Sequence, residues 1–313
     1  MKVHRGWPKQ PGPGRALTLG VFDGVHRGHV RLLRRLRQRA QVLGVRAGVV
    51  TFDDHPHGTL APSQRPPRLA TPQQCLERFR CLGMDEVFLI RFDKGLAGTP
   101  AEAFVRRVLV RRLGVRHVVV GQDFVFGRGG RGGTALLRQL GRSLGFGVTV
   151  VPPLRRRGRV VSSSGLREQV AQGRMREAWQ WLGWPYTLHG RVVRGEGRGR
   201  TLGLPTANLR SLHELVPPPG IYLTGLRLAG RLRMGLCYIG RRPTFHPWGP
   251  QTIEINIPGW SRSLYGRRLA IHFYHRLRGD RRFSDAAALL RQVAKDRRRA
   301  RHFWTKWSKV IKM

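Results

Sequence analysis

The first half of the chain alternates between short apolar runs and amphipathic stretches. The runs predict strands at Leu17–Phe22, Val45–Phe52, Val87–Phe92, His117–Gly121 and Val148–Val151, and helices are predicted between them at Val30–Leu43, Pro100–Leu113 and Thr134–Leu144. In the first of these helices, Leu33, Leu36 and Ala40 fall at helical spacing with arginines on the other faces. This alternation favours a doubly wound, Rossmann-like α/β domain, in which helices cover both faces of a parallel sheet.

The second half of the chain has a different sequence pattern. A helical stretch at Leu166–Leu182 ends at Gly183, and the apolar runs beyond it are separated by Gly and Pro turns. The predicted strands are Leu188–Val193, Ile221–Leu228, Leu232–Ile239, Thr252–Ile257 and Arg268–Tyr274. We expect an antiparallel β-barrel followed by a helix at Ala286–Phe303. The predicted domains are residues 15–183 and 184–305, with residues 1–14 and 306–313 as loose termini.

The formal net charge of +42 is the most unusual number in the composition. A surface of this sign attracts phosphate polyanions, so nonspecific binding of RNA or polyphosphate is expected. Arginine accounts for 52 of the 59 basic residues, and the arginines are spread over nearly every segment. Coding biased toward Arg and Gly explains this spread at least as well as a dedicated binding face does.

The apolar stretches and the cysteines of the sequence both bear on where the protein resides. No apolar stretch approaches the roughly 20 residues that a transmembrane helix needs, and no apolar segment typical of a secretory signal follows the basic first residues. Cys75, Cys81 and Cys237 are odd in number and lack the spacing of a zinc site, which is typical of reduced thiols. We therefore expect a cytoplasmic protein without membrane association.

Residues Gly20–His29 read GVFDGVHRGH and connect the first predicted strand to the first predicted helix. A glycine-bearing turn at this place lets the backbone approach a phosphate, and the helix N-terminus adds unpaired N–H groups and a positive dipole. His26 and His29 face the same side and can donate hydrogen bonds to a triphosphate. The H-x-G-H pattern suits nucleotidyl transfer, which needs positioning and charge stabilisation. A histidine pair that only caps the helix explains the tetrapeptide equally well.

Three further segments support a nucleotide site. GQDFVFG at Gly121–Gly127 and TFDDHPH at Thr51–His57 each stand at a predicted strand end, and SSSGLR at Ser162–Arg167 begins a helix with hydroxyls and a guanidinium suited to phosphate. With the H-x-G-H turn, this ordered set resembles the FMN adenylyltransferase module of bacterial bifunctional flavin enzymes. For Asp53, His55 and His57, a polar strand end without a ligand remains an equal alternative.

The resemblance implies that His26 and His29 act in adenylyl transfer by stabilising the ATP phosphates. The nucleotide-binding residues that it implies in this module are Gly20, Phe22, Asp23, Gly24, Gly28, Asp123, Ser163, Ser164 and Arg167. The sequence departs from the family at Val21, where Asn is common, and near Gly133, where an acidic or amide residue is common. These departures concern adenylylation more than nucleotide binding.

The most specific stretch, at residues Gly190–Asn208, reads GRVVRGEGRGRTLGLPTAN. Its glycines form a loop whose N–H groups can fold over phosphates, and Thr206 and Asn208 offer the hard oxygen ligands that Mg²⁺ prefers. No G-K-[ST] follows the glycines, so this is not a Walker loop. The stretch resembles the riboflavin kinase signature. The candidate nucleotide-binding residues here are Gly195, Gly199 and Arg200, and the candidate Mg²⁺ ligands are Thr206 and Asn208.

Supporting kinase segments follow in the order of that family. They are GIY at Gly220–Tyr222, YIGRRPTF at Tyr238–Phe245, IEINI at Ile253–Ile257, LYG at Leu264–Gly266 and LRGDRRF at Leu277–Phe283. Glu254, on an otherwise apolar strand, is the candidate general base for phosphorylating a primary alcohol. From spacing alone, an outward-facing strand residue paired with an arginine is the alternative. Departures from the family are Tyr238, where Asn is usual, and Gly259–Ser263, where an acidic turn is common.

Both resemblances together cover roughly residues 16–301 and imply a bifunctional riboflavin kinase/FMN adenylyltransferase. The implied reactions are ATP-dependent phosphorylation of riboflavin to FMN and adenylylation of FMN to FAD with release of pyrophosphate. Mg²⁺ is the expected cofactor, ATP the co-substrate, and FMN both a product and a substrate. Two alternatives stay open: a riboflavin kinase with weakened or lost adenylyltransferase activity, and a basic RNA-binding protein on a vestigial enzyme fold.

Overall fold

The computed structural model describes residues 1–8, 13–195, 203–241 and 251–311. Contacts divide the chain into two compact units, Met1–Ser163 and Ser164–Met313. The helical stretch before residue 183 belongs to the second unit by its contacts, whereas its sequence motif groups it with the first domain. Each unit has its own core and is described by itself.

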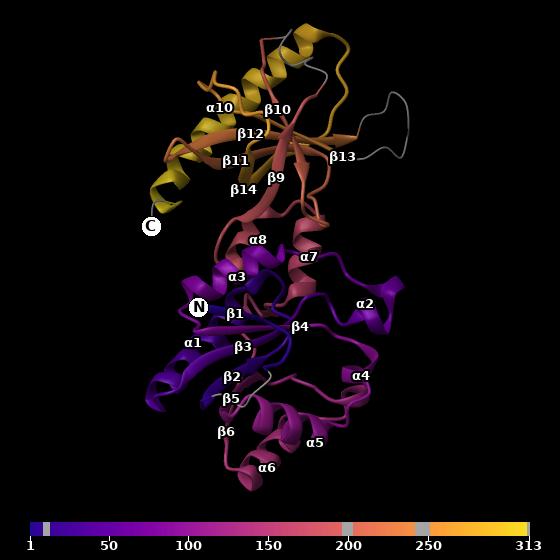
Figure 1. Cartoon of the computed structure of the whole chain (residues 1–313). Coiled ribbons are helices and arrows are strands. Elements are labelled where there is room, and N and C mark those ends of the chain that lie inside the picture. Colours follow the sequence, from indigo (N-terminus) through magenta and orange to yellow (C-terminus); the bar gives the residue numbers. More distant parts are fainter. Residues whose placement is uncertain (9–12, 196–202, 242–250, 312–313) are drawn as a thin grey trace. The chain divides into compact units, whose positions relative to one another are not determined.

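The N-terminal unit is built on a six-stranded parallel sheet with strand order β1-β4-β3-β2-β5-β6 (Figure 1). The strands are β1 (Lys2–Arg5), β2 (Arg15–Leu19), β3 (Arg46–Phe52), β4 (Glu86–Ile90), β5 (Val115–Gly121) and β6 (Gly147–Val151). From β2 the chain proceeds to β3 and β4, and then returns to β5 on the other side of β2. Ligands of such sheets bind where the winding reverses, at the carboxyl ends of β2 and β5.

Helices cover this sheet. They are α1 (Arg27–Val42), α2 (His57–Leu60), α3 (Pro72–Cys81), α4 (Lys94–Ala97), α5 (Ala101–Ala103), a π-helical segment at Phe104–Arg112 and α6 (Thr134–Leu144), followed by the hairpin β7 (Arg155–Arg156) and β8 (Arg159–Val160). Helix α1 packs against β2, β3 and β5, and α6 packs against β6. The central strands are buried on both faces, as parallel sheets require, and Leu17, Val50 and Phe88 are almost fully buried.

The first residues correct one expectation. Residues 2–5 were expected to be loose, yet they form β1, which pairs in parallel with β4. His4 secures the strand, because its ring stacks on Phe88 with centroids 4.7 Å apart and its Nε2 lies 3.4 Å from Oε1 of Glu86. The sequence KVHR has no apolar run, so the strand gives little signal of its own. Residues 9–12 of the expected loose segment lie outside the described residues.

The C-terminal unit contains a closed antiparallel barrel with strand order β10-β13-β12-β11-β14-β9 (Figure 1). Its strands are β9 (Tyr186–Val193), β10 (Ala207–Ser211), β11 (Gly220–Leu228), β12 (Arg231–Arg241), β13 (Gln251–Asn256) and β14 (Arg268–Gly279). Helix α8 (Met175–Leu182) packs on β9 and β14, and α10 (Ala286–Ile311) packs on β11, β12 and β14. The predicted fold class, a doubly wound α/β domain followed by an antiparallel barrel and a helix, is confirmed.

Two helix boundaries differ from the prediction. The single helix expected at Leu166–Leu182 is divided into α7 (Ser163–Ala171) and α8, because Gly173 between them has φ +72° and a Cβ there would lie 2.7 Å from Cδ of Arg276. The final helix continues through residues 306–311, which were expected to be loose. No Gly or Pro interrupts it, and Trp304 packs edge-on against Tyr274. Residues 312–313 lie outside the described part.

Candidate active sites

The H-x-G-H turn lies directly after β2, as predicted. A short 3₁₀ turn at Asp23–Val25 leads into α1. Gly24 has φ 76°, which glycine adopts without strain, whereas the next residue, the buried Val25, has φ 39°, a strained value for a β-branched side chain. Backbone strain of this kind concentrates at functional sites.

The carboxylate of Asp23 anchors this turn. It accepts hydrogen bonds from the backbone N–H of Leu69, with both oxygens at 3.0 Å, and from that of Ala70 at 3.3 Å. The Asp23 carbonyl in turn accepts a hydrogen bond from the Ser163 hydroxyl at 3.0 Å. The predicted nucleotide-binding residues Asp23 and Ser163 are therefore in direct contact, and the side chain of Asp23 holds the protein's own backbone.

The two histidines form a stacked pair. Their ring centroids are 3.7 Å apart with an angle of 17° between the planes, and the His29 N–H donates to Nδ1 of His26 over 3.3 Å. His26 thereby caps the N-terminus of α1. A Cβ on Gly28 would lie 3.0 Å from the His26 ring, and buried Phe22 contacts His29 edge-on at 5.0 Å. The capping interpretation of the tetrapeptide is therefore met, and the role of the two histidines in adenylyl transfer stays a prediction.

Burial keeps both histidines neutral. Burial lowers the pKa of His26 to about 4, with a backbone hydrogen bond opposing the shift. The pKa of His29 lies well below its usual value, because of burial and then because of the charge on His26. Since Nδ1 of His26 accepts a hydrogen bond, the proton of the neutral ring resides on Nε2, which is left to donate. Nδ1 of His29 is buried and has no hydrogen-bond partner among the described residues.

The remaining predicted residues of this site lie in two places. Gly20 directly follows β2, and Asp123 is exposed in the turn after β5, so both stand at the edge of the sheet where the winding reverses. Ser164 and Arg167 lie in the first two turns of α7, which belongs to the C-terminal unit. Their contribution to nucleotide binding stays a prediction.

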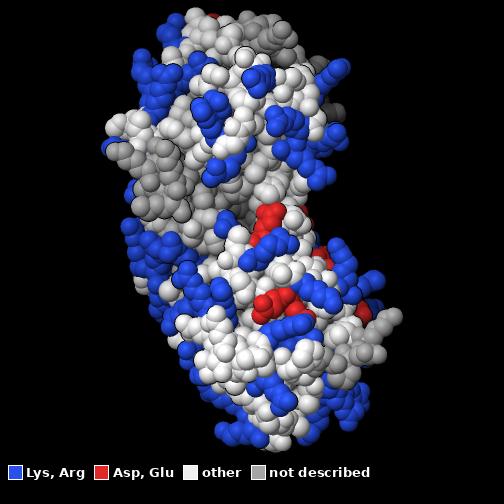
Figure 2. All heavy atoms as spheres, turned by 60° about the vertical axis from the view of Figure 1, so that its left-hand side comes forward, with Lys and Arg blue, Asp and Glu red and all other residues white. Residues whose placement is uncertain are grey.

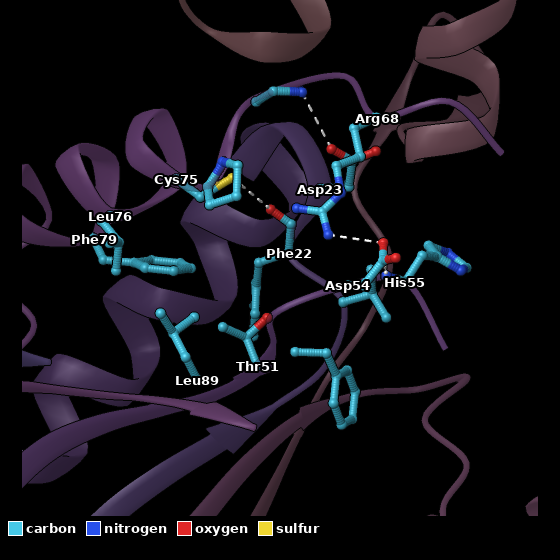
Figure 3. A pocket seen from close by; sticks show the side chains of 14 residues that line it. Phe22, Asp23, Thr51, Asp54, His55, Arg68, Cys75, Leu76, Phe79 and Leu89 are labelled. Carbon is cyan, nitrogen blue, oxygen red and sulfur yellow. Dashed lines mark hydrogen bonds and ion pairs between the residues drawn. The ribbon is translucent and has the colours of Figure 1, made fainter. Parts of the chain in front are cut away.

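A pocket opens on the β3 side of the H-x-G-H turn (Figure 3). One wall is apolar, with Phe22, Leu76, Phe79 and Leu89, and the other is polar, with Asp23, Asp54, His55 and Arg68. Arg68 pairs with Asp54 at 2.8 Å. Burial raises the pKa of Asp54, but hydrogen bonds from Arg68, the His55 backbone and Arg65 outweigh it and lower the pKa to about 2.

The pocket includes one residue of the TFDDHPH segment and adds residues that the sequence did not single out. Of the TFDDHPH segment, His55 lines the pocket, whereas His57 begins the exposed α2. Arg68 and Cys75 went unnoticed because no motif surrounds them. The Cys75 thiol contacts the Phe22 carbonyl at 3.6 Å, and burial, followed by the charge of Asp23, raises its pKa to about 12.

The second site lies on β10, β12 and β13 of the barrel. Asn208 and Tyr238 both pair with Glu254 in register, one from each neighbouring strand. The Thr206 hydroxyl donates to Oε2 of Glu254 over 3.0 Å. Gly195 lies against the Asn208 amide so closely that a Cβ there would overlap it. The candidate base, both candidate Mg²⁺ ligands and one loop glycine thus come together, whereas Gly199 and Arg200 lie outside the described residues.

Comparisons with known proteins agree with the division of the chain into two domains. A model of the FAD synthetase family matches residues 9–165, and a model of the riboflavin kinase family matches residues 182–304. The chain belongs to the bifunctional riboflavin kinase/FMN adenylyltransferase family. A family member from Listeria monocytogenes is 34% identical over 294 residues, covering 93% of each chain. One from Pseudomonas fluorescens is 37% identical over 283 residues, covering 90% of this chain and 91% of the relative.

A solved structure matches the fold over nearly the whole chain. It is described as a macrolide-efflux protein from Streptococcus pneumoniae, and it aligns with a TM-score of 0.88 at 25% identity, covering 96% of this chain and 99% of that one. In the part of the chain that the structure describes, no helix is long and apolar enough to cross a membrane. The family's two enzymatic domains are thus present in the predicted order, with riboflavin, FMN and ATP as their substrates.

Proposed function

We propose that Glu254 is the general base that accepts the proton of the riboflavin hydroxyl as ATP phosphorylates it in the barrel, and that His26 and His29 stabilise the phosphates during adenylylation of FMN in the parallel-sheet unit. The observation that carries the kinase assignment is the convergence of Thr206 and Asn208 on Glu254. An acceptor hydroxyl must lose its proton as it attacks the γ-phosphate, and a carboxylate within reach can accept that proton.

We propose Mg²⁺ as the cofactor of the kinase site, held by Thr206 and Asn208. The donor set fits, because a hydroxyl and an amide carbonyl are hard oxygen ligands and the neighbouring Glu254 carboxylate brings negative charge to the site. The Thr206 proton is directed to Glu254, which leaves the lone pairs of that hydroxyl available. When bound, Mg²⁺ offsets the negative charge of the nucleotide phosphates. The glycine at position 195 lets the backbone come close to this donor set.

In the adenylyltransferase unit, the donors are neutral. A neutral imidazole N–H and the unpaired N–H groups at the start of α1 can donate to phosphate oxygens without first giving up a proton. Gly20 and Gly28 keep side chains away from this approach, and Phe22 contacts the His29 ring edge-on. We propose that the pocket of Figure 3 receives part of FMN, because its apolar wall suits an aromatic ring system.

The test follows both products from one reaction. Purified full-length protein is incubated with riboflavin, ATP and Mg²⁺, and FMN and FAD are separated by chromatography. The parent is expected to form both, the His26→Ala variant FMN only, and the Glu254→Ala variant neither. Supplying FMN to the Glu254→Ala variant is expected to restore FAD, which shows that the protein is folded. A parent that forms no FMN contradicts the kinase proposal, and one that forms FMN without FAD favours the alternative of a kinase alone.

We also propose nonspecific binding of RNA, and a specific surface favours it. Helix α1 carries six arginines and no Asp or Glu, and five of these arginines are exposed. None of the six pairs with a carboxylate in the described part of the chain. Figure 2 shows Lys and Arg side chains spread over the visible face with few acidic side chains among them. A helix with this uncompensated charge suits a phosphate backbone.

We propose a cytoplasmic location, because Cys75, Cys81 and Cys237 form no disulfide.

A further inference from the structure

Tyr238 lies beside the candidate base of the kinase site. It pairs with Glu254 between β12 and β13, while Asn208 pairs with Glu254 between β10 and β13. Directly paired residues of neighbouring antiparallel strands point to the same face of the sheet. Asn208, Glu254 and Tyr238 therefore form a row across three strands, with the carboxylate in the middle.

One end of this row is the nucleotide side. Thr206, directly before β10, donates a hydrogen bond to Glu254, and Gly195 lies against the Asn208 amide. The proposed metal ligands and Gly195 thus stand on the β10 side of the carboxylate. In an in-line transfer, the attacking and leaving oxygens lie on opposite sides of the phosphorus. The acceptor alcohol must therefore approach Glu254 from the β12 side, where Tyr238 stands.

The Tyr238 ring is held in a defined position. The phenol extends along β12 over Gly240, where a Cβ would overlap the hydroxyl, so only glycine permits this placement. The hydroxyl lies 3.5 Å from Oδ2 of Asp280, which follows the end of β14. Burial, followed by the charges of Asp280 and Glu254, raises the pKa of Tyr238 to about 12. The phenol is therefore neutral at physiological pH and offers both a flat ring and a hydroxyl.

We propose that Tyr238 is a specificity-determining residue of the kinase, which contacts the flavin alcohol on the side of Glu254 opposite the nucleotide. This inference rests on the proposed role of Glu254. The ring supplies an aromatic surface for the flavin, and the hydroxyl can donate to or accept from a polar group of the acceptor. Tyr238 distinguishes an aromatic acceptor from a simple polyol, because only the former can use the ring.

The experiment compares Tyr238→Phe and Tyr238→Leu with the parent in the full chain. We measure kcat and the KM values for riboflavin and for ATP. Loss of one hydrogen bond is expected to raise the riboflavin KM about 3-fold in the Phe variant, and the additional loss of the ring to raise it about 10-fold in the Leu variant. The KM for ATP is expected to stay within about 2-fold, since the nucleotide lies on the other side of the carboxylate.

Two controls accompany these variants. Adenylylation of supplied FMN takes place in the other domain of the same molecule and is expected to be unchanged, which verifies concentration and folding. Leu212→Ala shortens a side chain of the same unit that is 62% exposed and belongs to none of the kinase segments, and it is expected to behave as the parent. An unchanged riboflavin KM in Tyr238→Leu, or an ATP KM that rises equally, overturns the proposal.

A separate measurement tests the contact between Tyr238 and the flavin independently of the proposed role of Glu254. Riboflavin binding without ATP is titrated by its fluorescence. Weaker riboflavin binding in Tyr238→Leu than in the parent supports the contact even if Glu254 proves not to be the base. Equal riboflavin affinity in the parent and in Tyr238→Leu overturns it, whatever Glu254 does.

Discussion

Arg15 donates through Nε to Oε2 of Glu86 over 2.6 Å, and both side chains are almost fully buried. Arg15 is on β2 and Glu86 on β4, so the ion pair passes across β3, which lies between these two strands. Nη1 of Arg15 also donates to the Leu113 carbonyl at 2.9 Å. One guanidinium therefore joins three segments of the N-terminal unit at the edge of the sheet away from the active site.

Replacing Glu86 is expected to destabilise this unit strongly. Glu86→Gln leaves the Arg15 charge buried without its counter-charge, which costs about 3–5 kcal/mol in comparable buried pairs. Arg46→Gln, which removes an exposed partner of the same carboxylate, is expected to cost about 1 kcal/mol or less. Denaturant unfolding followed by circular dichroism measures both variants, and equal costs would contradict the assignment of the energy to the buried pair.

The buried histidines predict a pH dependence of stability. His26 has a pKa of about 4 in the folded protein and about 6.5 when unfolded, so between these values the unfolded chain binds more protons. The free energy of unfolding is therefore expected to fall as pH decreases from about 6.5 toward 4. His26→Asn should reduce this slope by up to about 1.4 kcal/mol per pH unit. The exposed His302→Asn serves as the control, and a parental slope in His26→Asn would refute the assignment.

Gly28→Ala is expected to impair adenylylation without affecting the kinase. The new methyl group would lie 3.0 Å from the His26 ring, so the ring must shift. Because a misplacement of about 1 Å can cost roughly 100-fold in rate, a shift of a few tenths of an ångström is expected to cost about 10-fold or less. FAD formation from FMN and ATP measures the loss. Gln41→Ala, on the exposed surface of the same helix α1, is the control. Equal rates in the two variants would show that the ring position is not critical.

Gly195→Ala tests the kinase site in the same way. A Cβ there overlaps the Asn208 amide, which must then leave its place beside Glu254. We expect FMN formation to fall about 10- to 100-fold, while adenylylation of supplied FMN continues at the parental rate. Normal FMN formation by this variant would indicate that Asn208 does not need its present position.

The arginines of α1 predict a measurable salt dependence. Replacing Arg31, Arg34 and Arg35 by Gln should weaken binding of single-stranded RNA and reduce the slope of log K against log[salt] by about 0.7 per lost phosphate contact. The control replaces three exposed arginines of α10, Arg291, Arg298 and Arg301, which changes the net charge equally. If both triple variants lose affinity equally, the affinity for RNA depends on the net charge of the protein and not on helix α1. Unchanged binding in both would contradict the proposal altogether.

The sequence predicted the architecture and the two enzymatic domains, because strand–helix alternation and ordered motifs are local patterns. The predictions of secondary structure were wrong where contacts with distant segments determine whether a strand or a helix forms. The strand KVHR exists because β4 offers a free edge and Phe88 a stacking surface, neither of which is visible in four residues. The break between α7 and α8 depends on Gly173 lying against Arg276, a neighbour far along the chain.

The geometry of the two sites could likewise not be predicted from local sequence patterns. Spacing placed His26 and His29 on one side of a helix, but only the folded chain shows that the rings stack and that burial keeps them neutral. Glu254 was ambiguous by spacing alone, and the pairing of β10 with β13 brought Asn208 and Thr206 to it. Arg68 could not be found because its pairing with Asp54 joins a loop to a strand end.

The closed barrel and the open sheet differ in how they resist aggregation. In the barrel every strand is paired on both sides, so no row of unpaired backbone groups is available to a second molecule. The parallel sheet ends in β1 and β6, and β1 carries Lys2, His4 and Arg5, which discourage strand addition. The other edge, β6, reads GVTVV, an uncharged and β-branched segment. Partial unfolding at that edge is thus where self-association of the molecule would begin, and the barrel would be the last part to take part in it.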